Sequence, residues 1–248
     1  MSDRPMTDRP MTDRLFFRQL LAGRDFAIDD PIARQMVNFV YLIGDRDTGE
    51  AVAVDPAYGV GELIDLLGAE GLRLTGVLAT HWHADHVGGD LMGYPIQGIH
   101  DIVGRDDVSA PVHIQAPEAE WLKKFTGVSD SDLVLHDSGD VVMVGEIPVT
   151  LIHTPGHTSG GQCFLVDGKL IAGDTLFLEG CGRTDLPTAD PDEMYFSLTQ
   201  RLAVVPDDTI LYPGHLYSPE PFATMGETRK RNYVFRLPTL EQWRTMFG

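Results

Sequence analysis

The sequence predicts a mixed α/β (α+β) fold in which helices cover two sheets. Short, β-branched apolar runs recur along the chain, several of them are joined by turn sequences, and amphipathic segments with helical spacing lie between them. This alternation, with many hairpins, favours two helix-covered sheets over one parallel sheet. With 248 residues, of which 43% are hydrophobic, the chain is long enough to bury a full core.

The first predicted elements form a strand hairpin followed by a helix and another strand. Apolar runs at 36–45 and 50–56 are separated by the turn sequence RDTG, which is typical of paired strands. Residues 60–71 space their leucines as one helical face and end at a glycine. Residues 74–80 then form a buried strand that leads directly into His81.

The rest of the chain continues the alternation. Residues 88–104 are rich in glycine and are predicted as a loop with one helical turn. A strand over 111–115 and a helix over 117–125 follow. The remaining predicted elements are four strands, a helix, a strand and a C-terminal helix, at 140–145, 147–156, 161–168, 169–177, 190–205, 209–215 and 238–247 in that order.

The two ends of the chain differ from its middle. Residues 1–14 are a charged, proline-bearing tandem repeat, which predicts a disordered N-terminal tail, with Met11 as an alternative start. No linker divides the remainder. Residues 15–248 are therefore predicted to be a single domain with a short C-terminal helical extension.

The composition argues against several partners. Lys and Arg number 19 against 37 Asp and Glu, a net charge of −18 that would repel nucleic acid and anionic membranes. No apolar run approaches the ~20 residues of a membrane-spanning helix. Two cysteines, Cys163 and Cys181, are too few for a disulfide framework, so a cytoplasmic location is expected.

Four potential metal ligands lie within six residues of the stretch THWHADH: His81, His83, Asp85 and His86. Imidazole and carboxylate groups are ligands of zinc and similar ions. Neither a regular strand nor a regular helix would bring all four together. We therefore expect a strand that ends near His83 and a helix that begins near Asp85, a bend that offers two adjacent metal sites.

Three further potential ligands follow apolar strands in glycine-containing turns: His157 in HTPGHTSG, Asp174 in AGDTLF and His215 in LYPGH. His153 competes with His157 in the same stretch. Seven groups are enough for two metals that share one carboxylate. The isolated His100, His113 and His136 are interpreted as surface or core residues.

The motifs THWHADH, TPGHTSG, GDTLF and YPGH, in this order from about Val37 to His215, resemble the metallo-β-lactamase superfamily. The resemblance implies a four-layer αββα sandwich with the metals at one edge between the sheets. It further implies two ligand sets joined by a bridging carboxylate: His81, His83 and His157 for the first metal, Asp85, His86 and His215 for the second, and Asp174 between them. His153 then falls outside the ligands.

Within that superfamily, GCGRTDLP at 180–187 is similar to the glyoxalase II branch and to persulfide dioxygenases. The resemblance implies a hydrolase that cleaves a hydroxyacyl thioester, or a related ester, with a metal-bridging hydroxide oriented by Asp85. It leaves open a dioxygenase with one iron held by His81, His157 and Asp174. A non-catalytic metal or electron-transfer module is a third hypothesis.

Two divalent ions are expected, with zinc favoured and iron or manganese as alternatives, because these ligands suit all three. The expected partner is a small-molecule thioester or ester. A homodimer is compatible with the sequence, and the oligomeric state stays open.

Two departures from the resembled branch concern substrate selection. Glyoxalase II has a sizeable helical C-terminal domain that holds glutathione, and only a short segment follows His215 here. The region 88–112 is longer than expected. The thiol carrier could therefore differ from glutathione.

Several other side chains are given structural interpretations. Cys181 is expected to be a buried hydrophobe and Arg183 to pair with Asp185. The run at 229–231 is expected to be a solvated helix face. Trp82 and Tyr94 could line a pocket.

Overall fold

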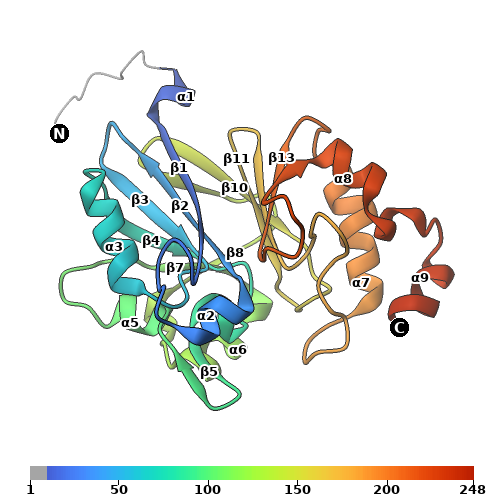
Figure 1. Ribbon diagram of the computed structural model, residues 1–248, viewed down its shortest axis with the longest axis horizontal. Coiled ribbons are helices and arrows are strands. Elements are labelled where there is room, and N and C mark those ends of the chain that lie inside the picture. Colours follow the sequence, from blue (N-terminus) through green and yellow to red (C-terminus); the bar gives the residue numbers. More distant parts are fainter. Residues whose placement is uncertain (1–9) are drawn as a thin grey trace.

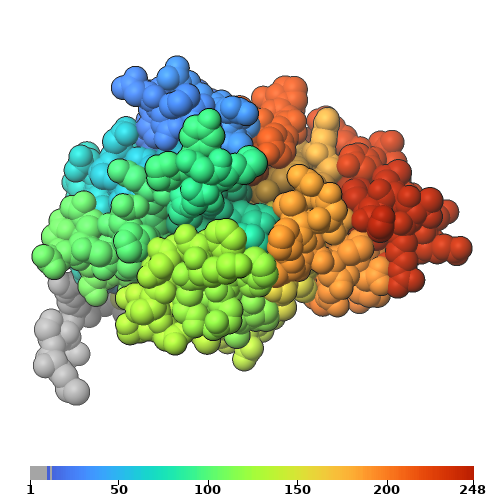
Figure 2. All heavy atoms as spheres, turned by 90° about the horizontal axis from the view of Figure 1, so that it is seen from below, coloured from blue at the N-terminus to red at the C-terminus, as the bar shows by residue number. Residues whose placement is uncertain are grey.

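The computed structural model describes residues 10–248, which form two six-stranded mixed sheets with helices on their outer faces (Figure 1). The strand order is β1-β2-β3-β4-β7-β8 in the first sheet and β14-β13-β12-β11-β10-β9 in the second. In Figure 2 the blue-to-green first half of the chain and the orange-to-red second half lie side by side. This arrangement confirms the predicted αββα class.

The first sheet contains β1 (Leu15–Leu21), β2 (Phe39–Asp45), β3 (Glu50–Val54), β4 (Arg73–Leu78), β7 (Val112–Gln115) and β8 (Leu133–His136). The first three strands are antiparallel, and β3, β4, β7 and β8 run parallel. Parallel neighbours need crossover connections, which the helices supply. The helices on this side are α2 (Pro31–Met36), α3 (Val60–Ala69), α5 (Ile99–Val103) and α6 (Ala119–Thr126).

The second sheet contains β9 (Val141–Val144), β10 (Ile147–His153), β11 (Gln162–Val166), β12 (Lys169–Gly173), β13 (Ile210–Pro213) and β14 (Ala223–Thr224). Its outer face is covered by α7 (Pro191–Phe196), α8 (Met225–Arg231) and α9 (Leu240–Phe247). The helix predicted over 190–205 continues beyond α7 as a π-helical turn and a 3₁₀ turn. Among residues 10–248, no helix is long and apolar enough to cross a bilayer.

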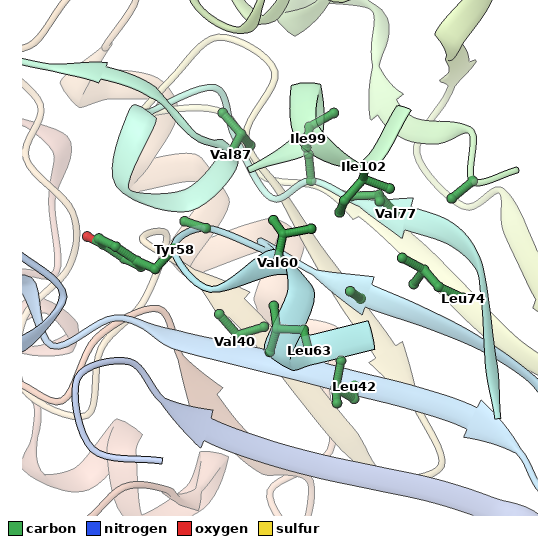
Figure 3. Packing of buried hydrophobic residues seen from close by; sticks show 14 of the residues in the cluster. Val40, Leu42, Tyr58, Val60, Leu63, Leu74, Val77, Val87, Ile99 and Ile102 are labelled. Atoms are coloured by element: carbon green, nitrogen blue, oxygen red, sulfur yellow. The ribbon is translucent and has the colours of Figure 1, made fainter. Parts of the chain in front are cut away.

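Strand β2 contributes side chains to two layers of the core, one on each face of the first sheet. Successive side chains of a strand point to opposite faces of the sheet. Val40 and Leu42 therefore face α3, where Leu63 packs against them (Figure 3). Tyr41 points instead into the layer between the sheets. Every residue of β2 is buried, so the run reads as continuously apolar rather than alternating.

The region predicted as a loop over 88–104 contains a small hairpin before the expected helical turn α5. Strands β5 (Gly89–Leu91) and β6 (Tyr94–Ile96) pair antiparallel. Met92 has φ 52° and Gly93 has φ 91°. Two positive φ values in a two-residue turn match the twist of the flanking strands, so a hairpin forms where glycine content alone predicted a loop.

The boundary predicted for the N-terminal tail is corrected at its last residues. Residues 1–9 lie outside the described part of the chain, but Met11–Arg14 form the short helix α1. The Arg14 guanidinium lies 2.7 Å from a carboxylate oxygen of buried Asp45 and 2.7 Å from one of Glu146. Arg14 thereby belongs to the folded domain, because it neutralises a buried charge.

Candidate metal centre

The seven side chains singled out in the sequence come together at strand ends contributed by both sheets. Strand β4 ends at Leu78, and α4 (Ala84–Val87) begins directly after His83, which is its N-cap residue. The helix begins near Asp85 as predicted, but the strand ends five residues before His83 rather than near it. From the second sheet, Asp174 follows β12 directly and His215 lies two residues beyond β13.

One group of possible ligands consists of His81, His83 and His157, whose ligand atoms all lie within 4.8 Å of one another. The Nδ1 of His83 is 2.9 Å from the Nε2 of His157. The Nε2 of His81 is buried and has no hydrogen-bond partner among the described residues. A buried polar atom without a partner is costly, and a metal ion at this point would satisfy it.

A second group consists of Asp85, His86 and His215, again with ligand atoms within 4.8 Å. The Nε2 atoms of the two histidines are 3.2 Å apart. Asp174 lies between the two groups, because its Oδ2 is 3.4 Å from the Nε2 of His215 and 3.7 Å from the Nε2 of His157. This is the position of a carboxylate that could touch two ions.

In His157 and His215, the ring nitrogen that points away from the centre is held by a hydrogen bond. The Nδ1 of His157 contacts the carbonyl of Arg183 at 2.8 Å, and the Nδ1 of His215 contacts the carbonyl of Met36 at 2.8 Å. A carbonyl can only accept, so these rings carry their proton on Nδ1 and present the Nε2 lone pair to the centre. Such contacts orient imidazole ligands in metal sites.

Asp55 makes the corresponding contact for His86, and sequence reasoning missed it. Its Oδ2 is 2.9 Å from the Nδ1 of His86 and accepts from the Thr80 hydroxyl at 2.6 Å. Its Oδ1 accepts from the Thr80 N–H at 2.7 Å. Asp55 directly follows the apolar run of β3, as the ligands follow their strands, and that signal could have found it.

Asn38 and Tyr58 were also missed, and no local motif marks them. The Nδ2 of Asn38 donates to Oδ2 of Asp85 at 3.1 Å. The Tyr58 hydroxyl donates to Oδ1 of Asn38 at 3.1 Å, which identifies the oxygen and nitrogen of the amide. Both side chains are buried. They hold the Asp85 carboxylate in place from the side of the first sheet.

Glu118 connects the loop that carries His81 and His83 with the loop that carries His157. Its fully buried carboxylate accepts from the N–H of Trp82 at 3.1 Å and from the N–H of Gly160 at 2.7 Å. Burial raises the pKa of Glu118 to about 7, although contacts with Thr158 and the two N–H groups oppose the shift. The contact connects the loop of His81 and His83 with the loop of His157.

Burial and neighbouring charges act in opposite directions on the histidines. Burial lowers the pKa of His81 well below its usual range and that of His83 to about 3, so both rings are neutral at neutral pH. Burial also disfavours the charged form of His86, but Asp85 and Asp174 outweigh it and raise its pKa. Neutral imidazole is the form that binds a metal, so ion binding at His86 would release a proton.

Two glycines leave room for the centre. A Cβ at Gly214 would lie 2.3 Å from Oδ1 of Asp174, and one at Gly182 would lie 2.2 Å from the Asp174 carbonyl. A side chain at Gly214 would displace the Asp174 carboxylate, and one at Gly182 would displace the main chain of Asp174. Tetrahedral zinc sites and related centres use this imidazole and carboxylate chemistry. The residues therefore fit a pair of divalent ions.

A cleft of about 770 Å³ opens onto part of the candidate metal centre, and its lining includes His83, Asp85, His157, Asp174 and His215. Trp82 and Phe125 stack with ring centroids 4.6 Å apart and form part of one wall. Phe177 and Tyr217 line it as well, and Tyr217 stacks on His215 at 4.6 Å. Tyr94, considered as a pocket residue, is exposed and does not line the cleft.

The remaining predicted residues lie outside the two groups. The Nε2 of His153 is 3.1 Å from the Ser159 carbonyl, and His113 contacts His136 at 2.9 Å. Arg183 pairs with Asp185 as expected. The first residue of the 229–231 run, Arg229, bonds to Asp207 and to two main-chain carbonyls rather than only facing solvent. Cys181 lines the cleft, and burial raises the pKa of its thiol to about 12.

Comparisons with known proteins agree with this geometry. The sequence profile of the Metallo-beta-lactamase superfamily matches residues 34–215. The chain is 30% identical over 206 residues to the probable polyketide biosynthesis zinc-dependent hydrolase BaeB of Bacillus velezensis, covering 83% of this chain and 85% of that protein. It is 36% identical over 186 residues to the hydroxyacylglutathione hydrolase of Aeromonas salmonicida, covering 73% of this chain but only 62% of that protein.

A second enzyme class is equally similar. The human mitochondrial persulfide dioxygenase ETHE1 is 30% identical over 199 residues, covering 78% of this chain and 70% of that protein. The crystal structure of ETHE1 from Myxococcus xanthus superposes with a TM-score of 0.74 at 29% identity, covering 94% of this chain and 89% of that one. Similarity alone therefore does not choose between hydrolysis and oxidation.

Proposed function

Because this chain belongs to the metallo-beta-lactamase superfamily, we propose that it is a metal-dependent hydrolase of a thioester or related ester. The observation that carries the proposal is the convergence of a complete double ligand set, with Asp174 between its halves. One metal would need only part of that set. We propose that His81, His83 and His157 hold one divalent ion, that Asp85, His86 and His215 hold the other, and that Asp174 contacts both.

Divalent ions in such paired sites lower the pKa of bound water to about 7 and polarise a carbonyl oxygen. Zinc is the proposed ion, supported by the similarity to a zinc-dependent hydrolase and by the ligand chemistry. Iron and manganese accept the same ligands.

The residues of this chain position the reactants. Asp85, held by Asn38, accepts a hydrogen bond from the attacking water and so orients it toward the carbonyl carbon. The oxygen of water bonds to that carbon, the carbon–sulfur bond breaks, and the products are a carboxylic acid and a thiol. A thiolate has a pKa near ~8.5, so it departs without a strong general acid. Trp82 and Phe125 form an aromatic wall on one side of the cleft.

Persulfide oxidation is the second candidate. It is favoured by the similarity to ETHE1 and by one subset of the residues, since His81, His157 and Asp174 form a two-histidine, one-carboxylate set. That set is typical of mononuclear iron oxygenases. It would leave Asp85, His86 and His215 without a metal.

Metal content and turnover separate the two candidates. Protein purified without added metal should contain two ions per chain, and the loaded protein should release thiol from acyl thioesters. His83→Ala should abolish this release, whereas His153→Ala, a matched histidine outside the ligand groups, should retain it. One iron per chain together with oxygen uptake on a persulfide would reject the hydrolase proposal.

A further inference from the structure

We infer that the cleft selects thioesters of uncharged thiols that carry an apolar acyl group and discriminates against thiols that bear carboxylates, such as glutathione. This inference rests on the proposed thioester hydrolysis and specifies its substrate class. Three features of the cleft support it: the arginine that lines it is already neutralised, its other charged side chains near the rim are acidic, and most of its wall is apolar.

Arg183 is the only lysine or arginine among the described residues that line the cleft. Its guanidinium is engaged in a two-pronged ion pair, in which Nε donates to Oδ1 of Asp185 at 2.8 Å and Nη2 donates to Oδ2 at 2.9 Å. This geometry is the one by which arginine binds carboxylates. Asp185 therefore occupies the place that a substrate carboxylate would need.

The other charges at the cleft, apart from the ligand groups, are those of Asp90 and Glu179. Both are exposed, and the whole chain carries a net charge of −18. Glutathione has two carboxylates and would approach these groups with like charge. Repulsion between like charges weakens binding of such a partner. At physiological salt this repulsion acts over about 8 Å, beyond which it is largely screened. An uncharged thiol meets no such repulsion.

The apolar wall is completed by the hairpin of β5 and β6. Its tip residue Met92 is 87% exposed and, with Leu91, lines the cleft. The hairpin is held close to the body of the protein, because a Cβ at Gly89 would lie 2.5 Å from the Phe125 carbonyl. Leu91 and Met92 therefore extend the apolar wall of the cleft, and concave, mostly apolar sites are typical of small-ligand binding.

Apolar side chains from the second half of the chain face the same space. Phe177, Leu186 and Pro187 line the cleft together with Tyr217 and Tyr233. A mostly apolar cleft with few polar groups is typical of sites that bury most of a small ligand. An acyl chain can therefore be enclosed while its thioester carbon reaches the metal ligands.

The test uses matched ligands that differ only in the thiol. S-hexylglutathione and the S-hexyl thioether of N-acetylcysteamine are not hydrolysed, so their binding to the metal-loaded protein can be measured by calorimetry. We expect the uncharged thioether to bind at least about tenfold more tightly. Sodium chloride should strengthen binding of S-hexylglutathione more than that of the uncharged ligand, because salt screens repulsion. Equal or tighter binding of S-hexylglutathione would overturn the inference.

A variant addresses the neutralised arginine directly. Asp185→Asn removes the partner of Arg183 and should improve binding of S-hexylglutathione relative to the uncharged thioether. Asp107→Asn is the matched control, because Arg105 and Asp107 form the same exposed, two-pronged pair and neither lines the cleft. An equal effect of the two variants would show that Arg183 does not set the selectivity and would count against the inference.

Hydrolysis of the two corresponding hexanoyl thioesters distinguishes the failure of this inference from the failure of the proposed function. If neither thioester is cleaved, the hydrolase proposal fails, while the thioether affinities still decide the selectivity. If the glutathione thioester is cleaved with the higher kcat/KM, the hydrolase proposal stands and the selectivity inference fails.

Discussion

Replacing Asp55 by Asn would test how the second ligand group is oriented. The carboxylate receives three hydrogen bonds, from the Thr80 N–H, the Thr80 hydroxyl and the Nδ1 of His86. Asn has the same shape but only one oxygen. Its NH₂ group would face at least one of these donors, so the network cannot be satisfied as it stands. Asp55 has φ 51°, a backbone conformation that Asn tolerates well, so the substitution adds little backbone strain.

The consequence reaches the metal ligand through its tautomer. If the introduced amide donates to Nδ1 of His86, the ring moves its proton to Nε2, the atom that faces His215 and the Asp174 carboxylate. A protonated Nε2 cannot bind an ion. Removing a partner of this kind lowers metal affinity by about 10–100-fold. Since each tenfold change is about 1.4 kcal/mol, the expected loss is about 1.4–2.8 kcal/mol.

Competition with a chelator of known affinity measures this loss for each ion. Asp55→Asn should weaken binding of the ion proposed at Asp85, His86 and His215, and the apo-protein should keep its far-ultraviolet circular dichroism. Asp25→Asn is the control, because that carboxylate bonds to the Leu21 N–H and to Arg24 and touches no ligand. Unchanged affinity for both ions in Asp55→Asn would refute the tautomer argument.

Three further predictions concern groups outside the ligand set. Arg14→Met leaves the buried Asp45 carboxylate without its cation and should cost about 3–5 kcal/mol of unfolding free energy in urea titrations. Arg18→Met breaks the half-exposed pair of Arg18 with Glu70 and should cost no more than about 1 kcal/mol. Glu118→Gln turns an amide NH₂ group toward one of the two main-chain N–H donors, so it should lower the free energy of unfolding by about 1–3 kcal/mol in the same assay. An unchanged free energy of unfolding would show that Glu118 does not stabilise the two loops. Burial and the adjacent imidazole lower the pKa of His113 to about 4, so the unfolded chain binds its proton first as pH falls. Stability from this group should be complete above about pH 6.5 and be lost toward pH 4, and His113→Asn should be relatively less destabilising at pH 5 than at pH 7.

Much of this cluster was predictable because its possible ligands are marked locally in the sequence. A dense motif such as that of His81 to His86 restricts the backbone to a bend, and the same pattern of strand end followed by ligand recurs three times. The supports were less visible. Asn38 lies 47 residues from Asp85 in sequence, and Glu118 lies 36 from Trp82, so only the tertiary fold brings each pair together.

The missed strands have a similar cause. Strand β1 carries Arg18 and Gln19 in its middle, which interrupts its apolar run, yet it pairs along its full length with β2. Strand β8 alternates weakly, because it is an edge strand whose central residues are exposed. Pairing with a neighbour, rather than intrinsic pattern, determines these two strands.

The origin of the ligands in both sheets has a consequence for assembly. His81, His83, Asp85 and His86 come from the first sheet, whereas His157, Asp174 and His215 come from the second, and the main chains meet where the Gln162 N–H donates to the Thr80 carbonyl at 2.9 Å. The proposed ions would cross-link two halves that bind them only after docking. Chelation would then lower the melting temperature by mass action.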